Sequence, residues 1–154
     1  RNVVFRNCHL RGANDPYYSV YTDDEGYALT VERCDITRPV VVGDGFTGRA
    51  NHVYAAEDGF CNDGYCFLAS NVLLEDNLID NMRGEPAANL DGIQVMGGSD
   101  IIIRSNWIET TSARIENGGV NAAIYIAPDV GAVSTVVVEH NADSGGRLLS
   151  AAHL

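Results

Sequence analysis

Four Asp-Gly steps are the residues of this sequence best suited to chemistry. They begin at Asp44, Asp58, Asp63 and Asp91. A carboxylate beside glycine can close a turn by accepting backbone N–H hydrogen bonds. When a second carboxylate lies one strand away, the pair instead shares a proton or holds a hard cation such as calcium. Which of these roles applies depends on how the strands stack.

Residues 89–109 predict how the chain stacks. They contain three short apolar runs separated by tight turns: alternating runs at 93–95 and 101–103, and a third that begins at Ile108. The pattern recurs along the chain when one turn residue of each repeat is aligned as an anchor. The aligned anchors are Cys8, Cys34, Asn51, Asn77, Asn106 and Asn141. Three parallel strands per repeat predict an all-β solenoid, a single-stranded parallel β-helix of about six coils.

A column of charged residues supports this alignment independently. The residue two before each anchor is expected to point outward, and its charge alternates from coil to coil. Stacked side chains lie about 4.8 Å apart, where opposite charges attract and like charges repel. Each exposed pair contributes only about 0–1 kcal/mol, so the column indicates register more than stability. Its members are Arg6, Glu32, Arg49, Glu75, Arg104 and Glu139.

The inward-facing columns are apolar. Residues five and three before the anchor are inward in most coils, and so is the residue two after it, which is apolar except at Asp143. The interval from Cys34 to Asn51 is short for a coil of three strands. Pro39 and the turn at 43–45 are expected to shorten the connections there.

Composition limits the function classes. The 154 residues are expected to form one domain, residues 1–154, and the start at Arg1 suggests a mature fragment or a piece of a longer solenoid. The net charge is −11, and all ten basic residues are Arg. Such a chain is a poor partner for nucleic acid, whose binding depends on neutralised phosphates. No apolar run approaches the length that a membrane-spanning helix needs, so membrane insertion is not expected.

The four cysteines divide into two pairs. Cys8 and Cys34 share the anchor column one coil apart, where they are expected to stack as free thiols, although a disulfide between them is conceivable. Cys61 and Cys66 would close a small loop if bridged. Their spacing matches no common zinc site. An oxidising, extracellular setting is the expectation.

The chain resembles the right-handed parallel β-helix superfamily, the pectate-lyase-like proteins. These include polysaccharide lyases, glycoside hydrolases and phage tailspike depolymerases. The resemblance rests on the repeat, on the turn Asn residues, and on segments 51–60 and 90–94, which look like those of secreted bacterial β-helix repeat proteins. It implies an extracellular or cell-surface protein that acts on polysaccharide. The Asp-Asp and His-Gly signatures of polygalacturonases and the Arg-x-Pro-x-x-Arg pattern of pectate lyases are not found, so neither activity carries over.

Asp91 on the central coil is the leading candidate for catalysis or calcium binding. Asp63 and Asp58 are rival partners for it on the preceding coil, while Ala122 ends the acidic column on the next. As a calcium site, Asp58, Asp63 and Asp91 would supply oxygen ligands. As glycosidase carboxylates, a pair would need to lie roughly 5–5.5 Å apart for retention or 6.5–9.5 Å for inversion. The alternative is that each Asp only closes its turn.

Several residues are candidates for substrate binding. Gln94 is expected on the same face as Asp91, and Tyr125 one coil further on, where both could contact a sugar; Tyr18 and Arg83 lie on long excursions that could wall a groove. Trp107 is expected to point outward under a loop or a partner. His52 and His140 are interpreted as surface residues. The prediction is a polysaccharide lyase or glycoside hydrolase; the alternative is a non-catalytic structural or carbohydrate-binding solenoid, such as an adhesin, a surface-layer protein or a tailspike-like protein.

Overall fold

The structure is a computed structural model that describes ten segments of the chain. They are residues 2–11, 19–22, 28–37, 40–54, 60–62, 69–82, 89–111, 119–128, 131–145 and 149–151. All of the regular structure in these segments is β-strand. None of them contains a helix that could cross a bilayer.

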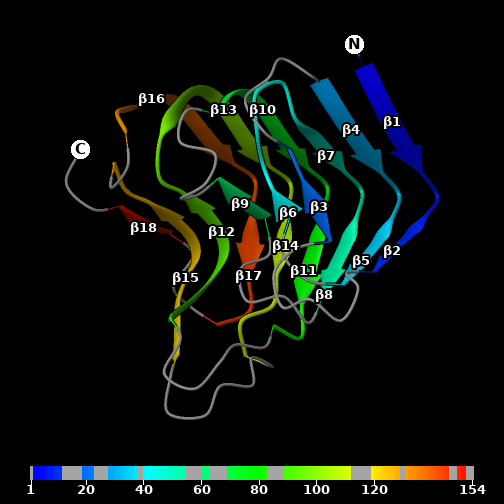
Figure 1. Ribbon diagram of the computed structural model, residues 1–154. Helices are drawn as coiled ribbons and strands as arrows, with labels where there is room; N and C mark the ends of the chain where they lie inside the picture. The colour runs from blue at the N-terminus through cyan, green and yellow to red at the C-terminus, as the bar shows by residue number, and fades with distance from the viewer. Residues whose placement is uncertain are drawn as a thin grey trace.

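Three parallel six-stranded sheets wind around one core. Each coil contributes one strand to each sheet, and Figure 1 shows the coils stacking from β1 and β2 at one end to β16 and β18 at the other. Sheet A holds β1 (Asn2–Arg6), β4 (Ala28–Glu32), β7 (Thr47–Arg49), β10 (Ser70–Glu75), β13 (Gly98–Arg104) and β16 (Val133–Glu139). Sheet B holds β2 (His9–Arg11), β5 (Asp35–Thr37), β8 (His52–Tyr54), β11 (Leu78–Asp80), β14 (Trp107–Ile108) and β17 (Ala142–Asp143). Sheet C holds β3 (Val20–Tyr21), β6 (Val40–Val41), β9 (Phe60–Asn62), β12 (Asn89–Val95), β15 (Gly119–Ile126) and β18 (Leu149–Ala151). The predicted parallel β-helix of six coils is confirmed.

The predicted register is confirmed along the charged column of sheet A. Each Arg lies directly opposite a Glu of the neighbouring coil, from Arg6 opposite Glu32 to Arg104 opposite Glu139. Glu75 lies at the centre and receives both neighbours: Arg49 Nε is 2.6 Å from one carboxylate oxygen and Arg104 Nη2 is 2.6 Å from the other. A shift of one residue would break every one of these pairs.

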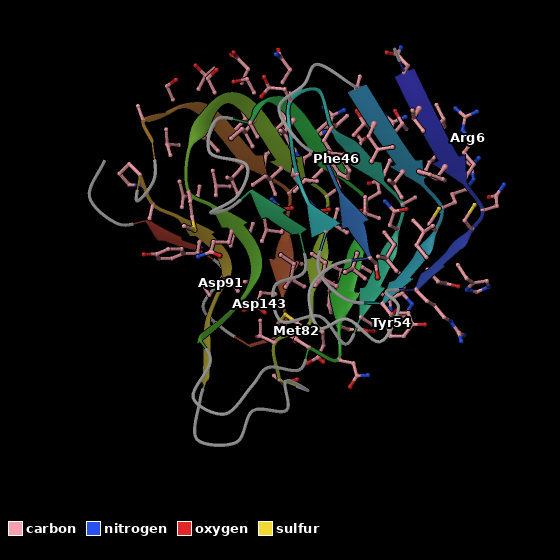
Figure 2. All side chains as sticks on the ribbon, viewed as in Figure 1. Arg6, Phe46, Tyr54, Met82, Asp91 and Asp143 are labelled. Carbon is pink, nitrogen blue, oxygen red and sulfur yellow. The ribbon has the colours of Figure 1, made fainter. Side chains whose placement is uncertain are left out.

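The inward columns form the core. The middle column of sheet B runs through Ile36, Val53, Ile79 and Ile108, all fully buried, and ends at Asp143 as the sequence predicted. The short coil between Cys34 and Asn51 still supplies three strands, β5, β6 and β7. After its tight turn at 43–45, Phe46 enters the core with no exposed surface, so this coil compensates for its length with a large side chain (Figure 2).

A ladder of asparagine side chains fills the turn between sheets A and B. The Asn106 carboxamide is 1% exposed, and its Oδ1 accepts hydrogen bonds from the backbone N and the Nδ2 of Asn77 at 3.0 and 2.9 Å. Its Nδ2 donates to Leu74 O and Asn141 Oδ1 at 3.0 and 2.9 Å. Asn51 and Asn77 repeat the pattern, so each Asn side chain satisfies one backbone N–H and one backbone C=O of the preceding coil.

The residue before each anchor adopts a left-handed conformation. Its φ lies between 52° and 55° in all six coils. This conformation bends the chain from sheet A into sheet B, and it is strained for a residue with a Cβ atom. The six residues are Asn7, Arg33, Ala50, Asp76, Ser105 and His140.

Cysteine replaces asparagine in the first two coils. Cys8 and Cys34 are free thiols, as expected. The Cys8 Sγ contacts Arg6 O at 3.1 Å and the Cys34 Sγ contacts Glu32 O at 3.4 Å. The side chains of Cys61 and Cys66, the pair expected to bridge if only one pair does, lie outside the described part of the chain.

Candidate functional site

Asp91 does not lie on an open face, contrary to the expectation that it shares a groove with Gln94. Its side chain is only 3% exposed, and its Oδ1 accepts a hydrogen bond from Ala122 N at 3.0 Å. Asp91 lies two residues before the buried Ile93, so alternation along β12 points its side chain inward, and the pairing of β12 with β15 is irregular between Leu90 and Asp91. Asp91 thus accepts a backbone N–H, as the alternative role expects, but the donor belongs to the next coil and not to its own turn.

The other predicted acidic residues lie outside the described residues. Phe60 pairs with Ile93 across β9 and β12. In that register, Asp58 aligns in sequence with Asp91, because Asp58 lies two residues before Phe60 and Asp91 lies two residues before Ile93. Asp63 does not align with Asp91. Arg83 and Tyr18 also fall outside the described segments.

The described residues offer no grouped metal ligands. Within these segments, no three His, Cys, Asp or Glu side chains lie close enough together to hold a metal ion. Asp91 already uses one oxygen on a backbone amide. Asp58 and Asp63, the other ligands predicted for calcium, lie outside these segments, so the calcium site predicted around Asp91 stays a prediction.

Gln94 and Tyr125 do share an outer position on sheet C. They lie directly opposite each other on β12 and β15, and both are half-buried. A histidine in contact with carboxylates lies elsewhere, on the outer face of sheet B.

Two carboxylates flank His52 on sheet B. Its Nε2 lies 2.9 Å from Asp80 Oδ1, and its Nδ1 lies 3.7 Å from Asp35 Oδ1. The second oxygen of Asp35 lies 3.0 Å from His9 Nδ1, so the network spans four strands, β2, β5, β8 and β11. The Asp80 contact is within hydrogen-bond distance and orients the imidazole ring, as carboxylates do for a histidine that binds a ligand or transfers a proton, whereas Asp35 at 3.7 Å lies beyond that distance.

An aromatic ring extends this network. The Tyr54 ring lies 4.7 Å from the His52 ring, centroid to centroid, tilted by 32°. Tyr54 also lies directly opposite Asp80 in the strand pairing. Figure 2 shows Tyr54 at the lower right of the solenoid, well away from Asp91, so sheets B and C present separate surfaces.

Two exposed apolar side chains continue the column of His52. Leu78 pairs with His52, and Trp107 pairs with Leu78, one coil further each time. Trp107 is 52% exposed and Leu78 is 36% exposed. The predicted outward position of Trp107 is confirmed. We refer to this surface as the sheet B platform, defined by His52, Tyr54, Leu78, Asp80 and Trp107.

Sequence reasoning missed the platform, although its signal was present. The position one after each anchor gives the outward column of sheet B, and the position three after gives the column beside it. The first column reads His9, Asp35, His52, Leu78, Trp107 and Ala142, and the second contains Arg11, Thr37, Tyr54 and Asp80. Treating His52 singly as a surface residue concealed its neighbours on adjacent coils.

Comparison with known families agrees with this architecture. The profile of the family described as right handed beta helix region matches residues 1–146. The chain belongs to this family. The match covers the coils that carry the sheet B platform, and it specifies a scaffold without naming a reaction. No curated protein matches the chain significantly.

Proposed function

We propose that this β-helix protein binds an extracellular polysaccharide along the outer face of sheet B. The observation that supports the proposal most is the side-by-side placement of an exposed Trp107 and Leu78 with the His52–Asp80 pair in one strip of surface. An aromatic face stacks on the C–H face of a sugar ring, while neighbouring polar groups hydrogen-bond its hydroxyls.

The spacing of the coils suits a polymer. Successive side chains of one column are about 4.8 Å apart, so a chain lying along the solenoid axis meets a new outward residue at each coil. Repetition lets several weak contacts add up in one long ligand. The rigid sheet orders these side chains in advance, which reduces the entropic cost of binding.

Cleavage of the bound polysaccharide, by a lyase or hydrolase reaction, is a second candidate function. It is favoured by the geometry of His52, whose two nitrogens face Asp80 and Asp35 beside Tyr54. A half-exposed imidazole oriented by a carboxylate is suited to general acid–base chemistry. Asp91 takes no part in this proposal because it is buried against backbone.

Affinity electrophoresis through gels containing neutral or acidic polysaccharides tests binding. Trp107→Ala is expected to weaken binding of the retarding polysaccharide by about tenfold or more, as truncation of a central aromatic contact typically does. Val137→Ala is the matched control, since Val137 is 43% exposed but lies on sheet A. Equal retardation of Trp107→Ala and wild type would refute the proposal.

The second candidate is tested separately with His52→Gln. If the platform cleaves its ligand, this variant is expected to keep the binding that Trp107 and Leu78 contribute while losing product formation, measured as new reducing ends or unsaturated ends. Unchanged product formation by His52→Gln would exclude His52 as the acid–base group without affecting the binding proposal.

A further inference from the structure

The first two coils carry a pair of stacked thiols whose geometry suits oxidation. Cys8 and Cys34 occupy the same turn position, bracketed by the strand pairs Arg6–Glu32 and His9–Asp35. The hydrogen bond from Asp35 N to Cys8 O, 2.9 Å long, holds the two turns together immediately beside the cysteines. The residue before each cysteine has the same left-handed conformation, with φ of 53° and 52°. The two cysteine backbones are therefore superimposed one strand spacing apart.

This spacing falls within the Cα range of a disulfide, and the Cβ atoms need to approach by only a few tenths of an ångström from one strand spacing. Directly stacked residues of parallel strands lie about 4.8 Å apart, and disulfide-linked Cα atoms lie roughly 4.4–6.8 Å apart. The Cys34 Sγ also lies 3.8 Å from Phe5 O, a carbonyl of the first coil, so this sulfur reaches across to the coil that carries Cys8. No change of register is needed to bring the sulfurs together.

The two thiols differ in access. Cys8 is half-buried at the end of the described solenoid, whereas Cys34 is only 2% exposed. Burial raises the pKa of the Cys34 thiol, which keeps it protonated and protects it from direct oxidation. An oxidant in solution therefore meets Cys8 first.

We propose that Cys8 and Cys34 form a redox-active pair that a peroxide converts to a disulfide joining the first two coils. In the first step, the Cys8 sulfur attacks one peroxide oxygen, the O–O bond breaks, and Cys8 becomes a sulfenic acid while the peroxide is reduced to water or an alcohol. In the second step, the Cys34 sulfur attacks the Cys8 sulfur, the S–O bond breaks, and the Cys34 proton leaves with the hydroxyl as water. Two thiols lose two electrons in total, and these reduce the peroxide.

Peptide mapping after treatment of the folded full chain with hydrogen peroxide tests the proposal. Trypsin cleaves after Arg6, Arg11, Arg33 and Arg49 but not at Arg38, which precedes Pro39. A Cys8–Cys34 disulfide therefore joins peptide 7–11 to peptide 34–49, with a mass lower than their sum by two hydrogens. Any Cys61–Cys66 bridge stays inside peptide 50–83, so the two disulfides are distinguished without mutating either pair.

The expected result is that the joined peptide appears with peroxide, disappears with reductant, and is absent in Cys8→Ser. The midpoint of thermal unfolding is expected to rise on oxidation in wild type and to stay unchanged in Cys8→Ser, since the cross-link restricts the unfolded chain. Recovery of peptide 7–11 carrying sulfinic acid, with an unmodified peptide 34–49, would overturn the proposal. A Cys8–Cys8 link between two chains would overturn it as well.

Discussion

Replacing Asn106 by leucine removes the centre of the asparagine ladder while keeping side-chain volume similar. Two backbone groups lose a side-chain partner: Asn77 N–H, which donates to Asn106 Oδ1 at 3.0 Å, and Leu74 C=O, which accepts from Asn106 Nδ2 at 3.0 Å. Each buried polar group left unpaired costs about 1–3 kcal/mol. The Asn77 side chain loses its hydrogen bond to Asn106 Oδ1 but keeps the one to Gly48 O, so this carboxamide stays partly satisfied. We expect a total loss of about 2–4 kcal/mol.

Urea denaturation of wild type and Asn106→Leu, followed by circular dichroism, measures this loss. For a chain of this size, the same change corresponds to a fall in Tm of roughly 4–16 °C. Asn2→Leu is the control, because Asn2 is exposed on β1. A loss for Asn106→Leu no larger than that for Asn2→Leu would refute the account of the ladder.

Two further predictions concern turns and charges. Ala50→Gly is expected to stabilise the fold by about 0.5–1 kcal/mol in thermal unfolding, because relief of the left-handed strain at φ 52° exceeds the entropic cost of glycine. Ala132→Gly is the control: Ala132 has no left-handed conformation, so this change is not expected to stabilise the fold. For Glu75, burial raises the carboxyl pKa, but hydrogen bonds and charge from Arg104 and Arg49 outweigh this and lower it. A lowered folded-state pKa stabilises the fold above the unfolded-state value of about 4.3, and this contribution is lost as the pH falls through the folded-state value. The Tm difference between wild type and Glu75→Gln is therefore expected to be largest near neutral pH and to shrink below about pH 4, and a constant difference would contradict it.

The coils were predictable from the sequence because the contacts that fix the strand register repeat once in every coil. Stacked positions such as Arg49 and Glu75 must be compatible with both neighbours, so the alternation of charge reveals the alignment without any structure. The same applies to the anchor column, where an Asn side chain is needed to satisfy backbone at each turn. Even the coil of Phe46 follows the pattern despite its short length.

The functional surface was less predictable, because it depends on contacts between coils. Asp91 lies two residues before the buried Ile93, so alternation along β12 already places its side chain inward, on the face opposite Gln94, and the sequence prediction overlooked this spacing. The network around His52 joins residues 28 positions apart, such as His52 and Asp80. It becomes visible only when outward residues are compared along a column instead of one at a time.

Hydroxyl-radical footprinting with and without a bound polysaccharide tests the central proposal most directly. The ligand is the polysaccharide that most strongly retards the wild-type protein in affinity electrophoresis. Oxidation of Trp107 and Leu78 on sheet B is expected to fall when it binds, while oxidation of Val137 on sheet A and Tyr125 on sheet C stays the same. Protection of Tyr125 with unchanged oxidation of Trp107 would contradict the account and place the ligand on sheet C.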